Sequence, residues 1–132
     1  LFGEVGGRVL GVNYDPSHLI RMGIDPVRFL HEFVDRVHHV HAKDTEIFDE
    51  ALYECGNLQG SILQKPHGSG AHVWRYAVPG HGQAGGGKIL GILTEAGYRG
   101  LVSIELEDEN YSSSEESYQR GLLVSGDFLE TV

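Results

Sequence analysis

The sequence predicts an α/β fold in which parallel strands alternate with helices. Three short runs, at 8–14, 37–43 and 101–106, are rich in β-branched and apolar residues, as is typical of strands. Segments with apolar residues at helical spacing lie between these runs and after the last one. Strands that alternate with helices form βαβ units with right-handed crossovers, and therefore a parallel sheet.

Two Asp-Pro pairs bound the first unit. The strand RVLGVNY ends at Asp15 and Pro16, and a helix is predicted to begin at Asp25 and Pro26, where aspartate caps the helix and proline suits its first position. We expect a loop between the strand and this helix. The apolar face of the helix comprises Val27, Leu30, Phe33, Val34 and Val37.

The second strand, VHHVHAK, precedes the least regular part of the chain. Residues 44–73 show neither the helical nor the strand period and contain several glycines, so a long loop is predicted there. Loops of this length are uncommon in compact domains and are usually functional. We expect a lid or a contact with another subunit, followed by glycine-rich turns at 74–87.

The last unit comprises a helix, a strand and a closing helix. KILGILTEAGY carries apolar residues at helical spacing, and Gly97 can end this helix. After the strand LVSIEL, Ser113 or Ser114 can cap a final helix, whose first turn is acidic and therefore suits the positive end of the helix dipole. The inward side of this helix is expected to contain Tyr118, Leu122, Phe128 and Leu129.

One face of the predicted sheet becomes polar toward the strand ends. Alternation places Ser103 and Glu105 on one side of the last strand, and His41 and Lys43 on one side of the second, while Asp15 ends the first. In a (β/α)8 barrel, residues at the carboxyl ends of the strands form the active site. Such a barrel needs about 250 residues. We therefore predict that residues 1–132 form a single domain, a partial (β/α)8 barrel of three βα units.

Composition argues against several classes of partner. The net charge of −9 opposes binding to nucleic acid, whose phosphates require basic patches. Cys55 is the single cysteine and has no partner for an internal disulfide. No apolar run approaches the roughly 18 residues of a membrane span, and no basic and apolar leader opens the sequence. We expect a cytoplasmic protein that acts on a small molecule, with no nucleic acid or membrane partner.

Asp15, His41 and Glu105 together form a mixed oxygen and nitrogen ligand set. Such a set suits a divalent ion such as Mn²⁺, Mg²⁺, Co²⁺ or Zn²⁺. His18, three residues after Asp15, is expected at the rim of the same pocket. A metal there would polarise a carbonyl group while a neighbouring carboxylate moves a proton. These two operations suffice to isomerise or epimerise a sugar.

The chain resembles the sugar phosphate isomerase/epimerase family of xylose-isomerase-like TIM barrels, which also contains inosose dehydratases, ketose 3-epimerases and apurinic endonucleases. The resemblance is carried, in this order, by GVNYDPSHL, GIDP, VHHVHAKDTE, WRYAVPGHG, LTEAGYRGLVSIELED and SEE…RGLLVSGDFL. It implies that the chain is the C-terminal portion of such a barrel, its last three βα units. It also implies a sugar or cyclitol substrate and a divalent metal.

The resemblance implies a role for each matching residue. Asp15 and His41 correspond to metal ligands, and Glu105 to a glutamate that binds the metal and exchanges a proton with the substrate. His18 corresponds to a catalytic substrate contact in epimerase-like members and to a metal ligand in the endonucleases. Substrate-binding positions near the barrel mouth match His18, Lys43, Asp44 and Arg75.

Two departures from the family pattern stand out. The family's fourth metal ligand, a glutamate on the preceding strand and the second acid/base, has no counterpart here. After Gly82 the sequence reads QAGGG instead of an acidic residue followed by aspartate and tryptophan. The first departure implies an incomplete active site, completed by an N-terminal segment of the same protein or by assembly of copies into a homo-oligomer.

Two other functions remain open. A truncated, non-catalytic module could bind a metal or a sugar, or serve in assembly. An apurinic-endonuclease-like phosphodiesterase would use a metal cluster to activate water. The acidic charge and the lack of a second Asp-x-His pair after His41 favour a sugar or cyclitol isomerase or epimerase over this second alternative.

Overall fold

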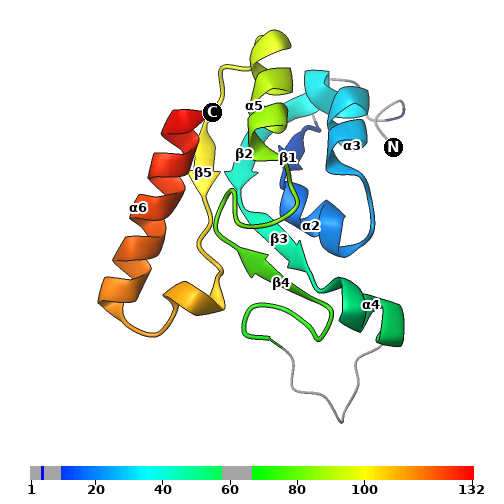
Figure 1. The fold of residues 1–132 in the computed structure, drawn as a ribbon. Coiled ribbons are helices and arrows are strands. Elements are labelled where there is room, and N and C mark those ends of the chain that lie inside the picture. Colours follow the sequence, from blue (N-terminus) through cyan, green and yellow to red (C-terminus); the bar gives the residue numbers. More distant parts are fainter. Residues whose placement is uncertain (1–3, 5–9, 58–66) are drawn as a thin grey trace.

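The computed structural model has a three-stranded parallel sheet at its centre (Figure 1). The structure describes residues 4, 10–57 and 67–132. The strands β1 (Val12–Tyr14), β2 (Val37–Ala42) and β5 (Val102–Ile104) pair in the order β1-β2-β5. The predicted parallel α/β architecture is therefore confirmed. Residues 8 and 9 of the expected first strand lie outside the described part.

Two helices cover one face of this sheet and form the core with it. Leu30 of α3 (Pro26–Phe33) and Ile89 and Leu93 of α5 (Gly86–Glu95) are buried in one cluster with Tyr14 and Val40 of the sheet. The remaining buried members of the cluster are Ile20, Val37 and Ala84. The core thus fixes the sheet from one side and leaves the carboxyl ends of the strands open to carry polar groups.

Caps at the predicted positions begin and end these helices. The Asp25 side chain accepts hydrogen bonds from the backbone N–H groups of Val27 and Arg28, at 2.9 and 3.0 Å. Gly97 adopts a φ of 76° just after α5, a conformation that favours glycine. The Ser114 hydroxyl accepts from the Ser117 N–H at the start of α6 (Glu115–Thr131). All three boundaries follow the sequence prediction.

A short helix, α2 (Pro16–Arg21), replaces the loop predicted after the first strand. Asp15 caps it by accepting from the Ser17 N–H at 2.9 Å, and Pro16 occupies its first turn. The prediction of a loop here was wrong. The same Asp-Pro pair that correctly located α3 also marks α2, so the sequence contained the information.

The segment predicted as a long loop, 44–73, contains regular structure in its first half. β3 (Asp44–Ile47) and α4 (Asp49–Cys55) lie there, and β3 pairs antiparallel with β4 (Trp74–Ala77), which falls in the predicted turn region. Both predictions were wrong because each strand is short and finds its partner across a large sequence separation. Residues 58–66 lie outside the described part.

Helix α6 runs beside β5 (Figure 1) and packs through small residues. Its buried positions are Gly121 and Ser125, whereas Tyr118 and Leu122 are 46% and 40% exposed, contrary to the prediction. Phe128 and Leu129, also predicted to face inward, are half-buried. A Cβ atom at position 121 would lie 2.9 Å from the Tyr111 side chain. This close approach requires glycine at position 121. The spacing of apolar residues does not reveal that α6 packs through a small-residue face.

Gly121→Ala is expected to lower the free energy of unfolding by about 1–3 kcal/mol, because the added methyl group overpacks the contact with Tyr111 and Leu106. Gly126→Ala is the matched control in the same helix, where a Cβ meets no atom within 4 Å. It should raise stability by up to about 1 kcal/mol through helix propensity. Urea unfolding measures both, and equal effects would contradict the packing shown here.

None of the helices in residues 4, 10–57 and 67–132 is long and apolar enough to cross a membrane.

Candidate active site

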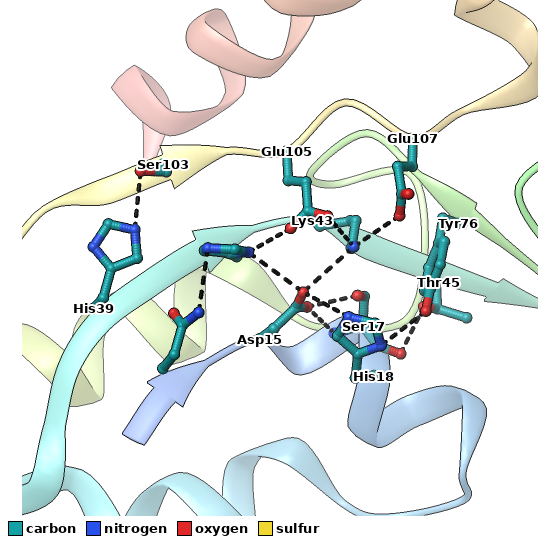
Figure 2. A network of polar contacts seen from close by, with 12 residues as sticks. Asp15, Ser17, His18, His39, Lys43, Thr45, Tyr76, Ser103, Glu105 and Glu107 are labelled. Carbon is teal, nitrogen blue, oxygen red and sulfur yellow. Dashed lines mark hydrogen bonds and ion pairs between the residues drawn. The ribbon is translucent and has the colours of Figure 1, made fainter. Parts of the chain in front are cut away.

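Three candidate ligand residues meet at the carboxyl ends of the parallel strands (Figure 2). Asp15 directly follows β1, His41 lies near the end of β2, and Glu105 directly follows β5. One ligand atom from each lies within 4.8 Å of the others. The His41 Nδ1 atom contacts a Glu105 carboxylate oxygen and lies 3.7 Å from Asp15 Oδ2. The tertiary structure thus brings together the set that the sequence singled out.

Strand register explains this convergence. His41 pairs with Ser103 across β2 and β5, and Asn13 pairs with His39 across β1 and β2. Side chains of these residues share one face, because His39 Nε2 lies 3.0 Å from the Ser103 hydroxyl and Asn13 Nδ2 lies 3.5 Å from His41 Nε2. The polar face predicted from strand alternation is therefore present.

The two oxygens of Asp15 have different environments. Oδ1 accepts hydrogen bonds from the backbone and hydroxyl of Ser17 and so serves the cap of α2. Oδ2 is buried and has no hydrogen-bond partner within the described part of the chain. It lies 3.4 Å from His18 Nε2, 3.5 Å from Lys43 Nζ and 3.7 Å from His41 Nδ1. A buried acceptor that lacks a hydrogen bond is costly, and at Oδ2 only these longer ion-pair contacts offset that cost.

Lys43 lies at the centre of the acidic groups (Figure 2). Its fully buried ammonium donates to Glu105 and Glu107, both at 2.9 Å, and lies 4.3 Å from the centre of the Tyr76 ring. Burial lowers the pKa of Lys43, but the hydrogen bonds to the two glutamates and the charge of Asp15 outweigh it and raise the pKa above its ordinary value.

Glu107 was not among the predicted site residues, although it shares strand alternation with Glu105. That spacing was the available signal for its presence beside Lys43.

For Glu105, burial raises the pKa, but the hydrogen bond and charge of Lys43 and the contact with His41 lower it below the ordinary value. Glu105 is therefore held as a carboxylate.

His18 lies on α2 at the rim of this group, with its side chain 43% exposed. Its Nε2 atom faces Asp15, while its Nδ1 atom contacts the hydroxyl of Tyr76 at 2.8 Å. The structure thus places His18 beside the three-residue cluster, as the sequence predicts, with an accessible ring.

Asp44 lies apart from the cluster of Asp15, His41 and Glu105. Its carboxylate is 2% exposed and accepts from the backbone N–H groups of Thr45, Ala84 and Gly80, at 2.8, 2.8 and 3.2 Å. Burial raises its pKa above the ordinary value, although these backbone hydrogen bonds oppose the shift. Asp44 therefore fastens the turn after β4 to the start of β3 and does not touch the three-residue cluster.

Arg75 likewise pairs with residues other than Asp15, His41 and Glu105. Its guanidinium pairs with Glu46 at 2.7 Å and lies 3.4 Å from Asp108 and 3.5 Å from Glu109. Since Glu46 is in β3 and Asp108 follows β5, Arg75 links the β3–β4 pair to the segment that carries Glu105. Substrate contacts by Asp44 and Arg75 remain predictions from the resemblance.

Comparison with known proteins identifies the family. A family model described as a xylose isomerase-like TIM barrel matches residues 1–127. The chain belongs to this family. In xylose isomerase-like TIM barrels the sheet is a closed parallel barrel, and the three parallel strands seen here, with polar residues at their carboxyl ends, form part of one.

Curated relatives of the xylose isomerase-like chain are longer proteins. Protein YfiH of Bacillus subtilis, which is uncharacterized, is 35% identical over 104 residues, covering 77% of this chain and 32% of that protein. An inosose dehydratase of Clostridium botulinum is 34% identical over 96 residues, covering 73% of this chain and 30% of the enzyme. The chain thus spans about a third of the length of these relatives.

A solved structure supports the same fold. The crystal structure of a xylose isomerase domain protein from Planctomyces limnophilus matches with a TM-score of 0.67 and 24% identity. The match covers 98% of this chain and 40% of that one. At this identity the likeness concerns the fold alone, and it confirms that the chain corresponds to part of a barrel.

Proposed function

We propose that this chain supplies the metal-binding carboxyl-terminal part of an enzyme that modifies a sugar or cyclitol by proton transfer next to a carbonyl group. Asp15, His41 and Glu105 would hold a divalent ion such as Mn²⁺, Mg²⁺, Co²⁺ or Zn²⁺. The observation that carries the proposal is the buried Asp15 Oδ2 atom, which lacks a hydrogen-bond partner within the described residues and lies beside the two other ligand atoms.

Charge supports a divalent ion. The carboxylates of Asp15, Glu105 and Glu107 surround a single ammonium, that of Lys43. These three carboxylates and one ammonium carry a net charge of about −2, which a divalent cation would balance. Carboxylate oxygens with one imidazole nitrogen form a donor set that all four ions accept.

The proposed chemistry assigns a task to each residue. A bound metal would supply Lewis acidity to a substrate carbonyl or hydroxyl group. Glu105, ionised beside Lys43, is the candidate base that takes a proton from the carbon next to that group. Lys43 holds Glu105 in place through its 2.9 Å hydrogen bond. His18 at the rim is the candidate contact to a substrate oxygen.

Two outcomes share this first proton transfer. An isomerase returns the proton to the former carbonyl carbon while a hydroxyl proton moves between the two oxygens, and an epimerase returns it to the same carbon from the opposite face. A dehydratase instead expels a neighbouring hydroxyl group, which takes up a proton and leaves as water. We propose isomerisation or epimerisation as the first activity to test. The inosose dehydratases among the relatives make dehydration of a cyclitol the second.

Open strand edges favour a partner that completes the site. Within the described residues, β1 and β5 each pair only with β2, and exposed strand edges readily pair with further strands. Leu101 beside β5 and Leu123 on α6 are also 75% and 68% exposed. We propose that an amino-terminal segment of the same protein, or a second copy of the chain, covers these edges and supplies a second acid/base.

Two further candidate functions are ranked lower. A non-catalytic module that binds metal or sugar would use the same three residues without a second acid/base. An endonuclease-like phosphodiesterase would need a basic surface for nucleic acid, which the net charge of −9 opposes.

The proposal is tested by measuring metal binding and turnover separately. Calorimetry with Mn²⁺, Mg²⁺, Co²⁺ and Zn²⁺ on this chain is expected to give one site per chain. A panel of ketoses and inososes is then assayed with this chain and with the longer protein that contains it. Turnover by the longer protein supports the proposal, metal binding without turnover in either favours the binding module, and no metal binding in either overturns it.

A further inference from the structure

Two hydrogen-bond donors converge on one nitrogen of the His18 ring. The Tyr76 hydroxyl lies 2.8 Å from His18 Nδ1, and the Nε atom of Arg21 donates to the same nitrogen at 3.3 Å. The other ring nitrogen, Nε2, lies 3.4 Å from Asp15 Oδ2. Figure 2 shows the His18 ring between Asp15 and Tyr76.

The chemistry of these partners fixes the proton on the ring. An arginine side chain has only donors, so Nδ1 must accept and therefore carries no hydrogen. A neutral imidazole has one N–H group, which then lies on Nε2. This N–H makes no hydrogen bond to Asp15 Oδ2, 3.4 Å away, so it can donate to another acceptor. Tyr76 is 8% exposed, and burial raises the pKa of its hydroxyl, so it keeps its proton and acts as a second donor.

Neighbouring contacts hold both donors in place. The Arg21 guanidinium lies 5.4 Å from the centre of the Trp74 ring, a cation–π distance. The Tyr76 ring contacts the His18 ring edge-on. The Lys43 ammonium lies over the Tyr76 ring, 4.3 Å from its centre. Trp74 and Tyr76 are alternate residues of β4, so this strand supports the donors from the side opposite Asp15.

We propose that Arg21 and Tyr76 are positioning residues that hold His18 in the Nε2–H tautomer, which makes it a hydrogen-bond donor to a substrate oxygen and not a metal ligand. A metal ligand must present a free lone pair, and here the lone pair of Nδ1 is engaged while Nε2 carries the proton. The role toward substrate rests on the proposed function. The tautomer itself does not, because the contacts that fix it come from Arg21 and Tyr76, which are not proposed metal ligands.

Nitrogen NMR of the chain with ¹⁵N-labelled histidine tests this inference. In the metal-free chain, His18 Nδ1 is expected at the shift of an unprotonated nitrogen and Nε2 at that of a protonated one. Tyr76→Phe keeps the ring beside Lys43 and Arg21→Met keeps an aliphatic stem, so each removes one donor. Each should move the His18 shifts toward the average of two tautomers, and the double variant should move them furthest.

Tyr98→Phe is the matched control, because it removes a hydroxyl that donates to the Leu101 carbonyl, away from His18. It should leave the His18 shifts unchanged. A protonated Nδ1 in the unmodified chain would overturn the inference, as would His18 shifts that neither Tyr76→Phe nor Arg21→Met alters. Circular dichroism of each variant is the check that it is folded.

Titration of the labelled chain with Zn²⁺ separates this inference from the proposed function. We expect the His41 resonances to shift while His18 keeps its tautomer. Coordination of Zn²⁺ through His18 would overturn the inference and leave the proposed metal site standing. Absence of Zn²⁺ binding to this chain, together with calorimetry that detects no metal in the longer protein, would overturn the proposed function, while the tautomer measured in the metal-free chain would still stand.

Discussion

Asp15→Asn is expected to weaken binding of Mn²⁺ by about 100-fold or more. The substitution replaces the charged Oδ2 atom, the buried oxygen without a hydrogen-bond partner in the described residues, by an amide group. Asparagine keeps an oxygen for the Ser17 N–H and caps a helix as well as aspartate does, so α2 should remain intact. Loss of a residue that hydrogen-bonds to a metal ligand typically lowers metal affinity by roughly 10–100-fold. Loss of the ligand itself should lower it at least as much.

Isothermal titration calorimetry measures this change, and thermal unfolding provides a second readout. A metal at about 100 times its dissociation constant stabilises the native state by about 2.7 kcal/mol, so the unmodified chain should melt higher with Mn²⁺ than with a chelator. Asp15→Asn should lose this difference. Asp127→Asn, an exposed carboxylate on α6, is the control and should keep it. An Asp15→Asn affinity within threefold of the unmodified chain would refute the assignment of Asp15 as a ligand.

Replacement of Asp44 by alanine should lower the free energy of unfolding by about 3 kcal/mol or more. The change leaves the buried backbone N–H groups of Thr45 and Ala84, and the partly buried N–H group of Gly80, without their acceptor. Each unpaired buried donor costs about 1–3 kcal/mol. The loss is partly offset because alanine removes the cost of burying a carboxylate, the same cost that raises the pKa of Asp44.

Chemical denaturation of the Asp44 variants provides the measurement. Asp44→Asn keeps one oxygen for Thr45 and Ala84 but turns an amide toward Gly80, so a smaller loss of about 1 kcal/mol is expected. Asp127→Ala, with an exposed side chain, should change stability by no more than about 0.5 kcal/mol. If Asp44→Ala behaved like Asp127→Ala, the anchoring of the turn after β4 would be disproved.

The carboxyl-end cluster shows why one part of the site could be predicted. Asp15, His41 and Glu105 each stand at the end of a strand with a recognisable pattern, and parallel strands bring their carboxyl ends to one edge. Alternation along a strand then decides which face each side chain occupies. Such local rules, together with the resemblance to a known family, were enough to select these residues.

The surroundings of the cluster could not be predicted in the same way. Tyr76 contacts His18 because β4 pairs with β3, and Arg75 joins Glu46 through the same pairing. Neither strand has a sequence pattern that identifies the strand it pairs with, and the sequence predicted a loop over β3 and the segment between the two strands. Glu107 was missed although its spacing from Glu105 was visible, because only its contact with Lys43 gives it a place in the site.

By itself the sequence determined the class of fold, the helix boundaries marked by Asp-Pro pairs, Ser114 and Gly97, and the identity of three converging side chains. These features depend on residues close together in the chain, whose capping and periodic patterns act locally. Tertiary structure alone decided the β3–β4 pair and the small-residue face of α6. Such features depend on contacts between distant segments, and no local sequence pattern identifies which segments will be in contact.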